Sequence, residues 1–295
     1  MKKSSANSRN HFLERVVLSV LFFYLVVGSA CYQKEEGCLD IKAVNFDVSA
    51  DIACEDCCEY PELSIRLDHK AILPDTTLPF RYDSLFYVAA YPDVKFRFHR
   101  LRYYLSDIRL VSGNAVGQPT DTLTLYLPQN PGDTVPVQVI DDFILADRDF
   151  LQANQLGRWE GDGAFDRLEF TLGVRDDIRY TDPQKVPSGH PLTAPDEGYN
   201  WEEGTGYISN FIAYSTENQP LDTLMVPVTT PVPVSLLLDP PLEIIPGYDI
   251  ELKLFLNYMA WFEDLDLSTA SPTSLEQHYV NRASNAFYQI EVLFK

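Results

Sequence analysis

Proline constrains the fold of this chain more than any other residue type. Twenty prolines are spread over 295 residues, and several gather in short segments such as TTPVPV and LDPPLEIIPG. A proline lacks the backbone N–H and breaks a helix interior, and within a sheet it is tolerated only at edges, ends or bulges. Long helices are therefore excluded over most of the sequence, and short strands joined by turns are expected.

Apolar and polar residues alternate in the stretches between the turn signals, as they do in strands that bury one face. In residues 96–105 the alternation changes phase between Phe98 and Leu101, so a β-bulge is expected near His99 and Arg100. The other alternating stretches are residues 123–127, 168–174, 250–256 and 288–294. Each stretch predicts one half-buried strand.

One or two short helices are expected among these strands, over residues 147–156 and 274–285. In the second segment, Ser274 and Gln277 have the spacing of a capping box. The sequence contains no internal repeat and no sign of a second large domain. It therefore predicts an all-β fold, an antiparallel β-sandwich with one or two short helices, formed by a single domain over residues 61–295.

The composition supports a folded domain and excludes nucleic-acid binding. Hydrophobic residues make up 45% of the chain, which is too apolar for a disordered protein. Lys and Arg number 23 against 43 Asp and Glu, giving a formal net charge of -20. Because binding to nucleic-acid phosphates needs clustered basic residues, no nucleic acid is expected as a partner.

The first 30 residues have the organisation of a signal peptide. Basic residues precede an apolar run at residues 16–27, which is shorter than the ~20 residues of a membrane-spanning helix. The small residues Ser29 and Ala30 then precede Cys31, an arrangement similar to the lipobox of bacterial lipoproteins. We expect cleavage after residue 30, lipidation of Cys31 and a lipid anchor in the outer membrane, since several acyl chains hold a protein on a bilayer.

Residues 31–60 are expected to form a lipidated linker and a Cys-rich segment. Lys34, Glu35 and Glu36 resemble the short export tag of surface lipoproteins from Bacteroidetes-type bacteria. The alternative is an ordinary solvated linker on a periplasmic lipoprotein. Both the periplasmic face and the cell surface therefore stay open as locations.

Four further cysteines, Cys38, Cys54, Cys57 and Cys58, lie within 21 residues of one another. In an exported protein this spacing indicates two disulfides, and the adjacent Cys57 and Cys58 are expected to bond to different partners. Three pairings are open to four cysteines. The alternative is a thiolate cluster on a soft metal ion such as Cu(I) or zinc.

Motifs of known enzyme classes are absent from the sequence, which lacks a phosphate-binding Gly loop, a nucleophile elbow and an HExxH helix. We therefore expect no enzyme activity. Acidic pairs such as Asp141 with Asp142 could serve glycoside hydrolysis, although most acidic residues are expected on the solvated surface. The Asp-rich segment 141–149 could supply oxygen ligands to a structural Ca2+ ion, but it lacks EF-hand spacing.

Histidine is scarce after the leader, where only His69, His99, His190 and His278 occur, each in a different segment. Taken singly, each can be interpreted as a structural residue that packs or forms hydrogen bonds within the protein and binds no metal. His99 falls at the expected bulge, His190 lies in a loop, and His278 lies beside the apolar face of the second predicted helix. His69 ends a strand-like stretch.

Several segments together resemble the MbnP-like family of exported proteins. These are RLRYYLSDIRLV at residues 100–111, FDRLEFTLGV at 165–174, GHPLTAPDEGYNWEEGTGY at 189–207, and a C-terminal stretch with WFEDLDLS followed by His278. The Tyr-Tyr-Leu-Ser-Asp-Ile segment is the most specific single motif. The resemblance covers about residues 61–295.

The resemblance implies copper binding for uptake or handling. In the family a tryptophan can be oxidised to kynurenine by a partner di-haem peroxidase of the MbnH type, and the oxidised residue and histidines help to hold the metal. Carried over to this chain, Trp201 would be the oxidised residue, His69 the first imidazole and His278 the second. Imidazole nitrogen is a suitable copper ligand.

The chain departs from the family pattern near Trp201. The family has Trp-x-Trp before Gly-Tyr, and here Glu203 occupies the position of the second Trp, while Tyr199 and Asn200 replace the usual Met and Tyr. These changes put the ligand set and the Trp modification in doubt. A second hypothesis, from another class, is a surface adhesin or glycan-binding sandwich, suggested by the many aromatic residues.

Overall fold

The structure is a computed structural model, and it describes residues 33–82, 84–130, 133–148, 153–161, 163–193 and 199–295. The chain divides into two compact units. One comprises Ile41–Asn45 and Glu59–Lys295 and is called the β-domain below. The other comprises residues up to Asp40 together with Phe46–Cys58, and is called the Cys-rich unit. The predicted signal peptide and Cys31 lie outside the described residues.

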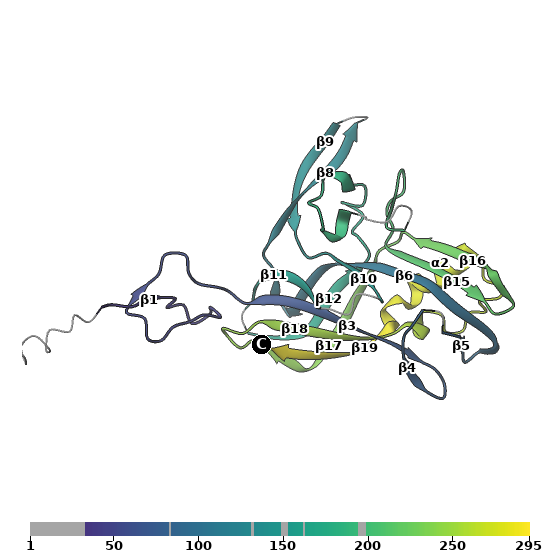
Figure 1. Cartoon of the computed structure of the whole chain (residues 1–295), viewed down its shortest axis with the longest axis horizontal. Helices are drawn as coiled ribbons and strands as arrows, with labels where there is room; N and C mark the ends of the chain where they lie inside the picture. The colour runs from purple at the N-terminus through teal and green to yellow at the C-terminus, as the bar shows by residue number, and fades with distance from the viewer. Residues whose placement is uncertain (1–32, 83, 131–132, 149–152, 162, 194–198) are drawn as a thin grey trace, which may run out of the picture. The chain divides into compact units, whose positions relative to one another are not determined.

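Two groups of strands face each other across the core of the β-domain (Figure 1). The first group contains β3 (Glu62–Ile72), β4 (Thr77–Pro79), β11 (Asn154–Glu160), β18 (Ile250–Asn257) and β19 (Phe287–Phe294). The second contains β5 (Phe86–Val88), β6 (Tyr91–Ser112), β7 (Ala115–Pro119), β10 (Ile144–Asp147), β12 (Ala164–Leu172), β15 (Asn210–Thr216), β16 (Gln219–Val228) and β17 (Val232–Glu243). Pairing of β7 with β11 joins them. The predicted all-β class is confirmed.

The remaining described strands form three small two-stranded sheets. The hairpin of β8 (Thr122–Asn130) and β9 (Asp133–Ile140) and the ribbon of β13 (Trp201–Glu202) and β14 (Gly206–Tyr207) belong to the β-domain. In the Cys-rich unit β1 (Glu36–Gly37) pairs with β2 (Ile52–Ala53).

Most strand pairs are antiparallel, as predicted, but β18 lies parallel to β3. Their register runs from Ile250 opposite Leu63 to Asn257 opposite Lys70. Parallel neighbours need a long crossover connection, and nearly the whole domain lies between these two strands in the sequence. Alternation along a strand reports its faces and not its direction, so this pairing was not predictable from the pattern.

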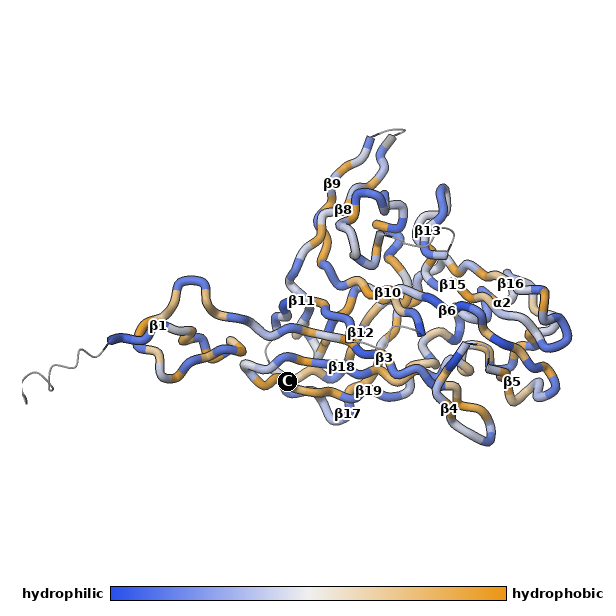
Figure 2. The backbone as a smooth tube through the Cα atoms, in the orientation of Figure 1, coloured by the Kyte–Doolittle hydropathy of each residue, from blue (hydrophilic) through white to orange (hydrophobic). Residues whose placement is uncertain are grey.

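The alternating patterns have the expected burial, except that Tyr288 in the last strand is 45% exposed. Along β18 and β6 the hydrophobic residues that alternate with polar ones can be followed in Figure 2. In β6, Arg100 pairs with Ala213 and Phe98 pairs with Tyr214, so His99 is passed over in the ladder. The β-bulge predicted at this point is therefore confirmed.

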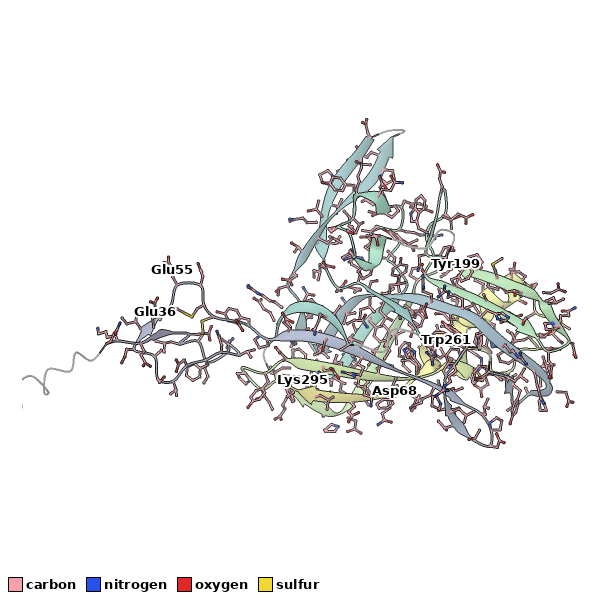
Figure 3. The ribbon with its side chains drawn as sticks, in the orientation of Figure 1. Glu36, Glu55, Asp68, Tyr199, Trp261 and Lys295 are labelled. Atoms are coloured by element: carbon pink, nitrogen blue, oxygen red, sulfur yellow. A yellow bond between two sulfur atoms is a disulfide. The ribbon has the colours of Figure 1, made fainter. Side chains whose placement is uncertain are left out.

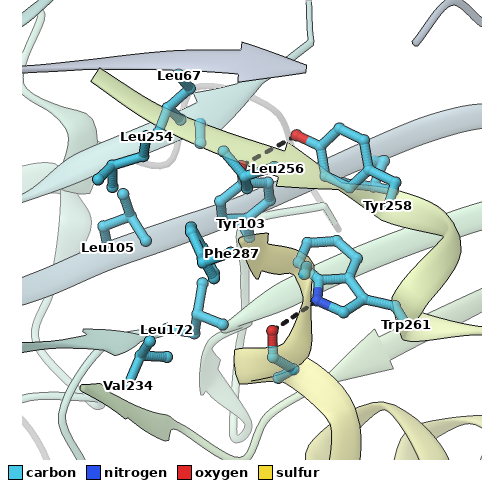
Figure 4. Close-up of a cluster of buried hydrophobic side chains, with 14 of the residues drawn as sticks. Leu67, Tyr103, Leu105, Leu172, Val234, Leu254, Leu256, Tyr258, Trp261 and Phe287 are labelled. Atoms are coloured by element: carbon cyan, nitrogen blue, oxygen red, sulfur yellow. Dashed lines mark hydrogen bonds between the residues drawn. The ribbon is translucent and has the colours of Figure 1, made fainter. Parts of the chain in front are cut away.

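The main core lies between the two strand groups. Figure 4 shows its centre, where side chains from both groups meet, including Leu67, Leu254, Leu256 and Phe287 on one side and Tyr103, Leu105, Leu172 and Val234 on the other. A second apolar cluster lies on the opposite face of β6. It consists of Tyr104, Leu123, Leu125, Val139, Phe143, Val174, Ile178, Val186, Leu192 and Tyr207. Burial of both faces explains why residues 101–106 are all buried.

The helices differ in part from the prediction. The second predicted helix is present as α2 (Pro272–Arg282), followed by the 3-10 turn η4 (Ala283–Ala286). Its capping box is formed by Ser271 and Ser274, one turn before the predicted pair, because Pro272 fits the first helical position. The other 3-10 turns are η1 (Pro183–Lys185), η2 (Pro191–Thr193) and η3 (Tyr258–Trp261).

The helix predicted over residues 147–156 is wrong at both ends that the structure describes. β10 ends at Asp147, and β11 starts at Asn154; residues 149–152 lie outside the described chain. Asp147 pairs with Arg102 of β6, and Leu156 is buried. Pairing with strands far away in the sequence therefore overrides the local helical preference. Among the described residues, no helix is long and apolar enough to cross a bilayer.

Candidate functional site

His69 lies on β3 at the edge of the main core and is 5% exposed. Its Nδ1 is 2.6 Å from the hydroxyl of Tyr258, and the two rings stack with their centroids 5.7 Å apart. The Tyr258 hydroxyl is also 3.0 Å from that of Tyr103, a bond drawn in Figure 4. Burial raises the pKa of both tyrosines, so both stay protonated at neutral pH. The result is an imidazole whose orientation is fixed by a neighbouring hydroxyl.

Trp201 starts the short strand β13 and pairs with Tyr207 of β14. The indole is half-buried against the second apolar cluster, and its Nε1 is buried with no hydrogen-bond partner among the described residues. Residues 194–198, just before it, lie outside the described part. Glu203, at the position of the family's second Trp, is exposed in the turn between β13 and β14.

A buried ion pair holds the residue next to Trp201. Arg102 and Asp147 are 6% and 1% exposed, and the Nε of Arg102 is 3.0 Å from Oδ2 of Asp147. The guanidinium of Arg102 also donates a 3.0 Å hydrogen bond to Oδ1 of Asn200. Asp147 further accepts hydrogen bonds from Arg100 and from the hydroxyl of Tyr82. This network ties β6 and β10 to the start of β13.

Both departures from the family pattern before Trp201 are part of this arrangement. Asn200 receives the Arg102 guanidinium, and the ring of Tyr199, labelled in Figure 3, lies 5.7 Å from the Arg100 guanidinium. Sequence reasoning missed Arg102 and Asp147. A signal was present, because a charged residue that precedes two buried tyrosines in a strand needs a counter-ion.

His278 lies on α2, beside the buried residues Leu275 and Tyr279. The side chain is half-buried, and its Nε2 is buried without a hydrogen-bond partner among the described residues. An unsatisfied buried nitrogen destabilises a fold by about 1–3 kcal/mol, so such atoms call for an explanation. Trp201 and His278 each have one such nitrogen, Nε1 in the indole and Nε2 in the imidazole.

Two of the three predicted copper-site residues, His69 and Trp201, pack in different side-chain clusters. His69 joins the side chains around Tyr103, while Trp201 packs against the cluster of Tyr104. These two tyrosines point to opposite faces of β6. No group of three or more His, Cys, Asp and Glu side chains in the described chain is arranged to hold a metal ion. Copper binding by His69, Trp201 and His278 stays a prediction.

The residues nevertheless fit individual roles. Histidines that bind metals typically have one ring nitrogen fixed by a hydrogen-bond partner, and Tyr258 does this for Nδ1 of His69. An indole nitrogen carries its proton and offers no lone pair. Trp201 therefore fits an oxidation site better than a ligand in its unmodified form.

The other two histidines have protein partners. Nε2 of His190 is 2.8 Å from Asp141, and its Nδ1 accepts a hydrogen bond from the Leu192 amide. Nε2 of His99 is 2.8 Å from the hydroxyl of Ser215. These bonds accord with the structural interpretation of both residues.

The predicted Ca2+ segment uses its carboxylates within the protein. Asp141 bonds to His190, Asp142 accepts the Ile108 amide at 2.7 Å, and Asp147 binds Arg102. Residue 149 lies outside the described chain. Binding of Ca2+ at residues 141–149 stays a prediction that these contacts do not support.

The two predicted disulfides are present in the Cys-rich unit, where they pair Cys38 with Cys58 and Cys54 with Cys57. The adjacent Cys57 and Cys58 bond to different partners, as expected. Since all four sulfurs are bonded in pairs, the alternative of a thiolate metal cluster is wrong for this disulfide-bonded form.

Comparison with known proteins identifies one family. The family model for MbnP matches residues 60–278. No curated protein matches. Among solved structures, "MbnP from Methylosinus trichosporium" is similar at 12% sequence identity with a TM-score of 0.34, over 79% of this chain and 98% of that chain.

Proposed function

Because this chain belongs to the MbnP family, we propose that it is an exported lipoprotein that binds copper for uptake or handling, without catalytic turnover. The observation that carries this proposal is the family match over residues 60–278, since the family is associated with copper. The orientation of His69 by Tyr258 supports it.

We assign His69 the role of first imidazole donor and His278 that of a second. Copper, when bound, supplies a soft cation that accepts imidazole nitrogen. Tyr258 keeps Nδ1 of His69 in a hydrogen bond and so fixes which way the ring faces. The hydroxyl of Tyr258 is also 3.0 Å from that of Tyr103, and both tyrosines are fully buried.

We assign Trp201 the role of the oxidised residue, with a di-haem peroxidase of the MbnH type as partner. Trp201 is half-buried against the second cluster, so part of the residue is accessible. Intact-mass measurement on protein from its own host tests this role, since kynurenine formation adds one oxygen and removes one carbon. An unmodified Trp201 contradicts the partner but not binding by histidines.

The test of copper binding is a Cu(I) titration of the purified protein in competition with a coloured chelator. We expect one Cu(I) per chain at sub-micromolar Kd, and a loss of affinity of about tenfold or more in H69Q, because an imidazole ligand is removed. H99Q is the matched control, since Nε2 of His99 lies 2.8 Å from the Ser215 hydroxyl. Uptake no tighter than micromolar, or equal affinity in H69Q, would falsify the proposal.

The second candidate, a glycan-binding sandwich, has one observation in its favour. A cavity of about 720 Å3 in the β-domain is lined by aromatic residues, Tyr60, Trp159 and Tyr248, together with polar residues such as Arg158 and Glu160. Aromatic faces with nearby polar groups suit ligands that have one apolar face. Binding on a glycan array in the presence of a metal chelator, lost in Y248A, selects this alternative.

A further inference from the structure

The two disulfides of the Cys-rich unit differ in their surroundings. Cys38 is 1% exposed and pairs with the half-buried Cys58, 20 residues further along the chain. Cys54 is half-buried and pairs with the exposed Cys57, only three residues away. The yellow S–S bonds lie close to the labelled Glu55 in Figure 3. One disulfide is protected and the other is accessible.

The two bonds also differ in what they contribute to the fold. A disulfide stabilises a protein mainly by restricting the unfolded chain, and the restriction grows with the length of the closed loop. The Cys38–Cys58 bond closes a loop that contains β2 (Ile52–Ala53) and its connection from β1 (Glu36–Gly37), which lies directly before Cys38. The Cys54–Cys57 bond closes only Glu55 and Asp56. Breaking the shorter loop therefore leaves the unit tied together.

Accessibility decides which disulfides exchange with external thiols. The Cys57 sulfur belongs to an exposed residue, so a thiolate can approach it, while Cys38 is shielded. Glu55 and Asp56 between the two cysteines are both exposed. Their carboxylates attract cations to the same short loop.

We propose that Cys54 and Cys57 form a redox-exchangeable pair whose reduced form binds one soft monovalent cation, Cu(I). A thiolate of an external dithiol attacks the Cys57 sulfur, and the S–S bond breaks with Cys54 leaving as thiolate. The second thiolate of the dithiol then attacks the dithiol's first sulfur, which is bonded to Cys57 in the mixed disulfide. Cys57 leaves as a thiolate. The pair gains two electrons and two protons, and the external dithiol becomes a disulfide.

The reduced pair has the donors that Cu(I) prefers, because thiolate sulfur is a soft ligand. Cu(I) binding displaces the two thiol protons and leaves both sulfurs bonded to the metal, with no change in oxidation state. The Cα atoms of the pair are 5.7 Å apart, so both side chains can reach one ion. This site lies outside the family match and does not depend on copper binding at His69.

Selective reduction is the first test. The full chain is treated with dithiothreitol under native conditions, alkylated at intervals and mapped by mass spectrometry. We expect Cys54 and Cys57 to be alkylated about tenfold or more faster than Cys38 and Cys58, because exposed disulfides exchange first. Equal rates for both pairs, or alkylation only in denaturant, overturn the proposal.

Cu(I) uptake is the second test, measured by competition with bicinchoninate on the oxidised and the selectively reduced protein. We expect one additional Cu(I) per chain after reduction, absent in C54S/C57S and retained in H69Q. No additional uptake, or equal uptake in C54S/C57S, overturns the proposal. If the function proposed above is wrong, the result is different, because oxidised H69Q and oxidised wild type then bind Cu(I) with equal affinity.

Discussion

Asp142 illustrates how a single buried carboxylate stabilises a distorted strand. It is 6% exposed and accepts the Ile108 amide at 2.7 Å, next to Asp107, whose φ of 55° places it in the left-handed region. The ladder between β12 and β6 also changes register at this point. Burial raises the pKa of Asp142 to about 6, and the backbone hydrogen bonds oppose this only in part.

The raised pKa predicts a pH dependence of stability. The folded state binds the Asp142 proton more tightly than the unfolded chain, so this stabilising contribution is complete below about pH 4 and is lost as pH rises through about 6. Relative to D142N, which stays neutral, we expect wild type to lose up to about 3 kcal/mol of unfolding free energy between about pH 4 and 7. Urea unfolding at four pH values measures this difference.

D176N is the matched control for this prediction, because Asp176 is exposed. Its difference from wild type should stay constant over the same range. A constant difference for D142N as well would show that the Asp142 carboxyl titrates normally in the folded protein.

The residue scale also shows how far the candidate site was predictable. The sequence identified His69 and Trp201 through a family pattern, but not Tyr258, which lies 189 residues from His69. A hydrogen bond between two such distant residues leaves no trace in local spacing. The resemblance therefore supplied the residues, and the fold supplied their neighbours.

At the scale of elements, the ion pair of Arg102 and Asp147 joins three strands. Asp147 ends β10, Arg102 lies in the middle of β6, and Asn200 directly precedes β13. Removing one partner of a buried pair leaves the other charge poorly compensated. The network therefore matters both for the sheet and for the position of Trp201.

We expect R102M to lower the free energy of unfolding by about 3 kcal/mol, since Asp147 stays buried without its closest counter-ion. The double variant R102M/D147N should lose less unfolding free energy than the two single variants lose in total, because it removes the uncompensated charge. Urea unfolding gives these energies. Hydrogen exchange should also become faster at residues 199–202 in R102M.

R109M provides the comparison on the same strand. Arg109 pairs with Glu169 at 3.2 Å, but its side chain is 42% exposed, so we expect a loss of about 0–1 kcal/mol. Equal losses for R102M and R109M would mean that burial of the Arg102 pair has no energetic importance.

Strands were easier to predict than helices in this chain. The alternation around Phe98 and Leu101 located a bulge correctly, because side-chain parity reports directly on the ladder. The helix over residues 147–156 was wrong, because Asp147 and Leu156 are held by β6 and by the core. Local propensity is a weak preference that such contacts override.

At the scale of the whole molecule, the prediction concerns the anchor. If Cys31 is lipidated, C31S should move the protein from the membrane fraction to the soluble fraction, because the acyl chains supply the binding free energy. Fractionation after a high-salt wash measures this. C57S, which alters a cysteine inside a disulfide, should stay with the membranes. Membrane retention of C31S would instead indicate an uncleaved leader.

The sequence by itself determined the all-β class, the bulge in β6 and the presence of two disulfides. These properties follow from proline content, side-chain parity and cysteine spacing, which act over short distances along the chain. Only the tertiary structure decided that β18 lies parallel to β3, that Tyr258 holds His69, and that Trp201 packs on the other face of β6. Those arrangements depend on which distant segments come together. Burial of apolar surface drives this association, and because it is non-directional, the sequence pattern does not specify which segments pack against each other.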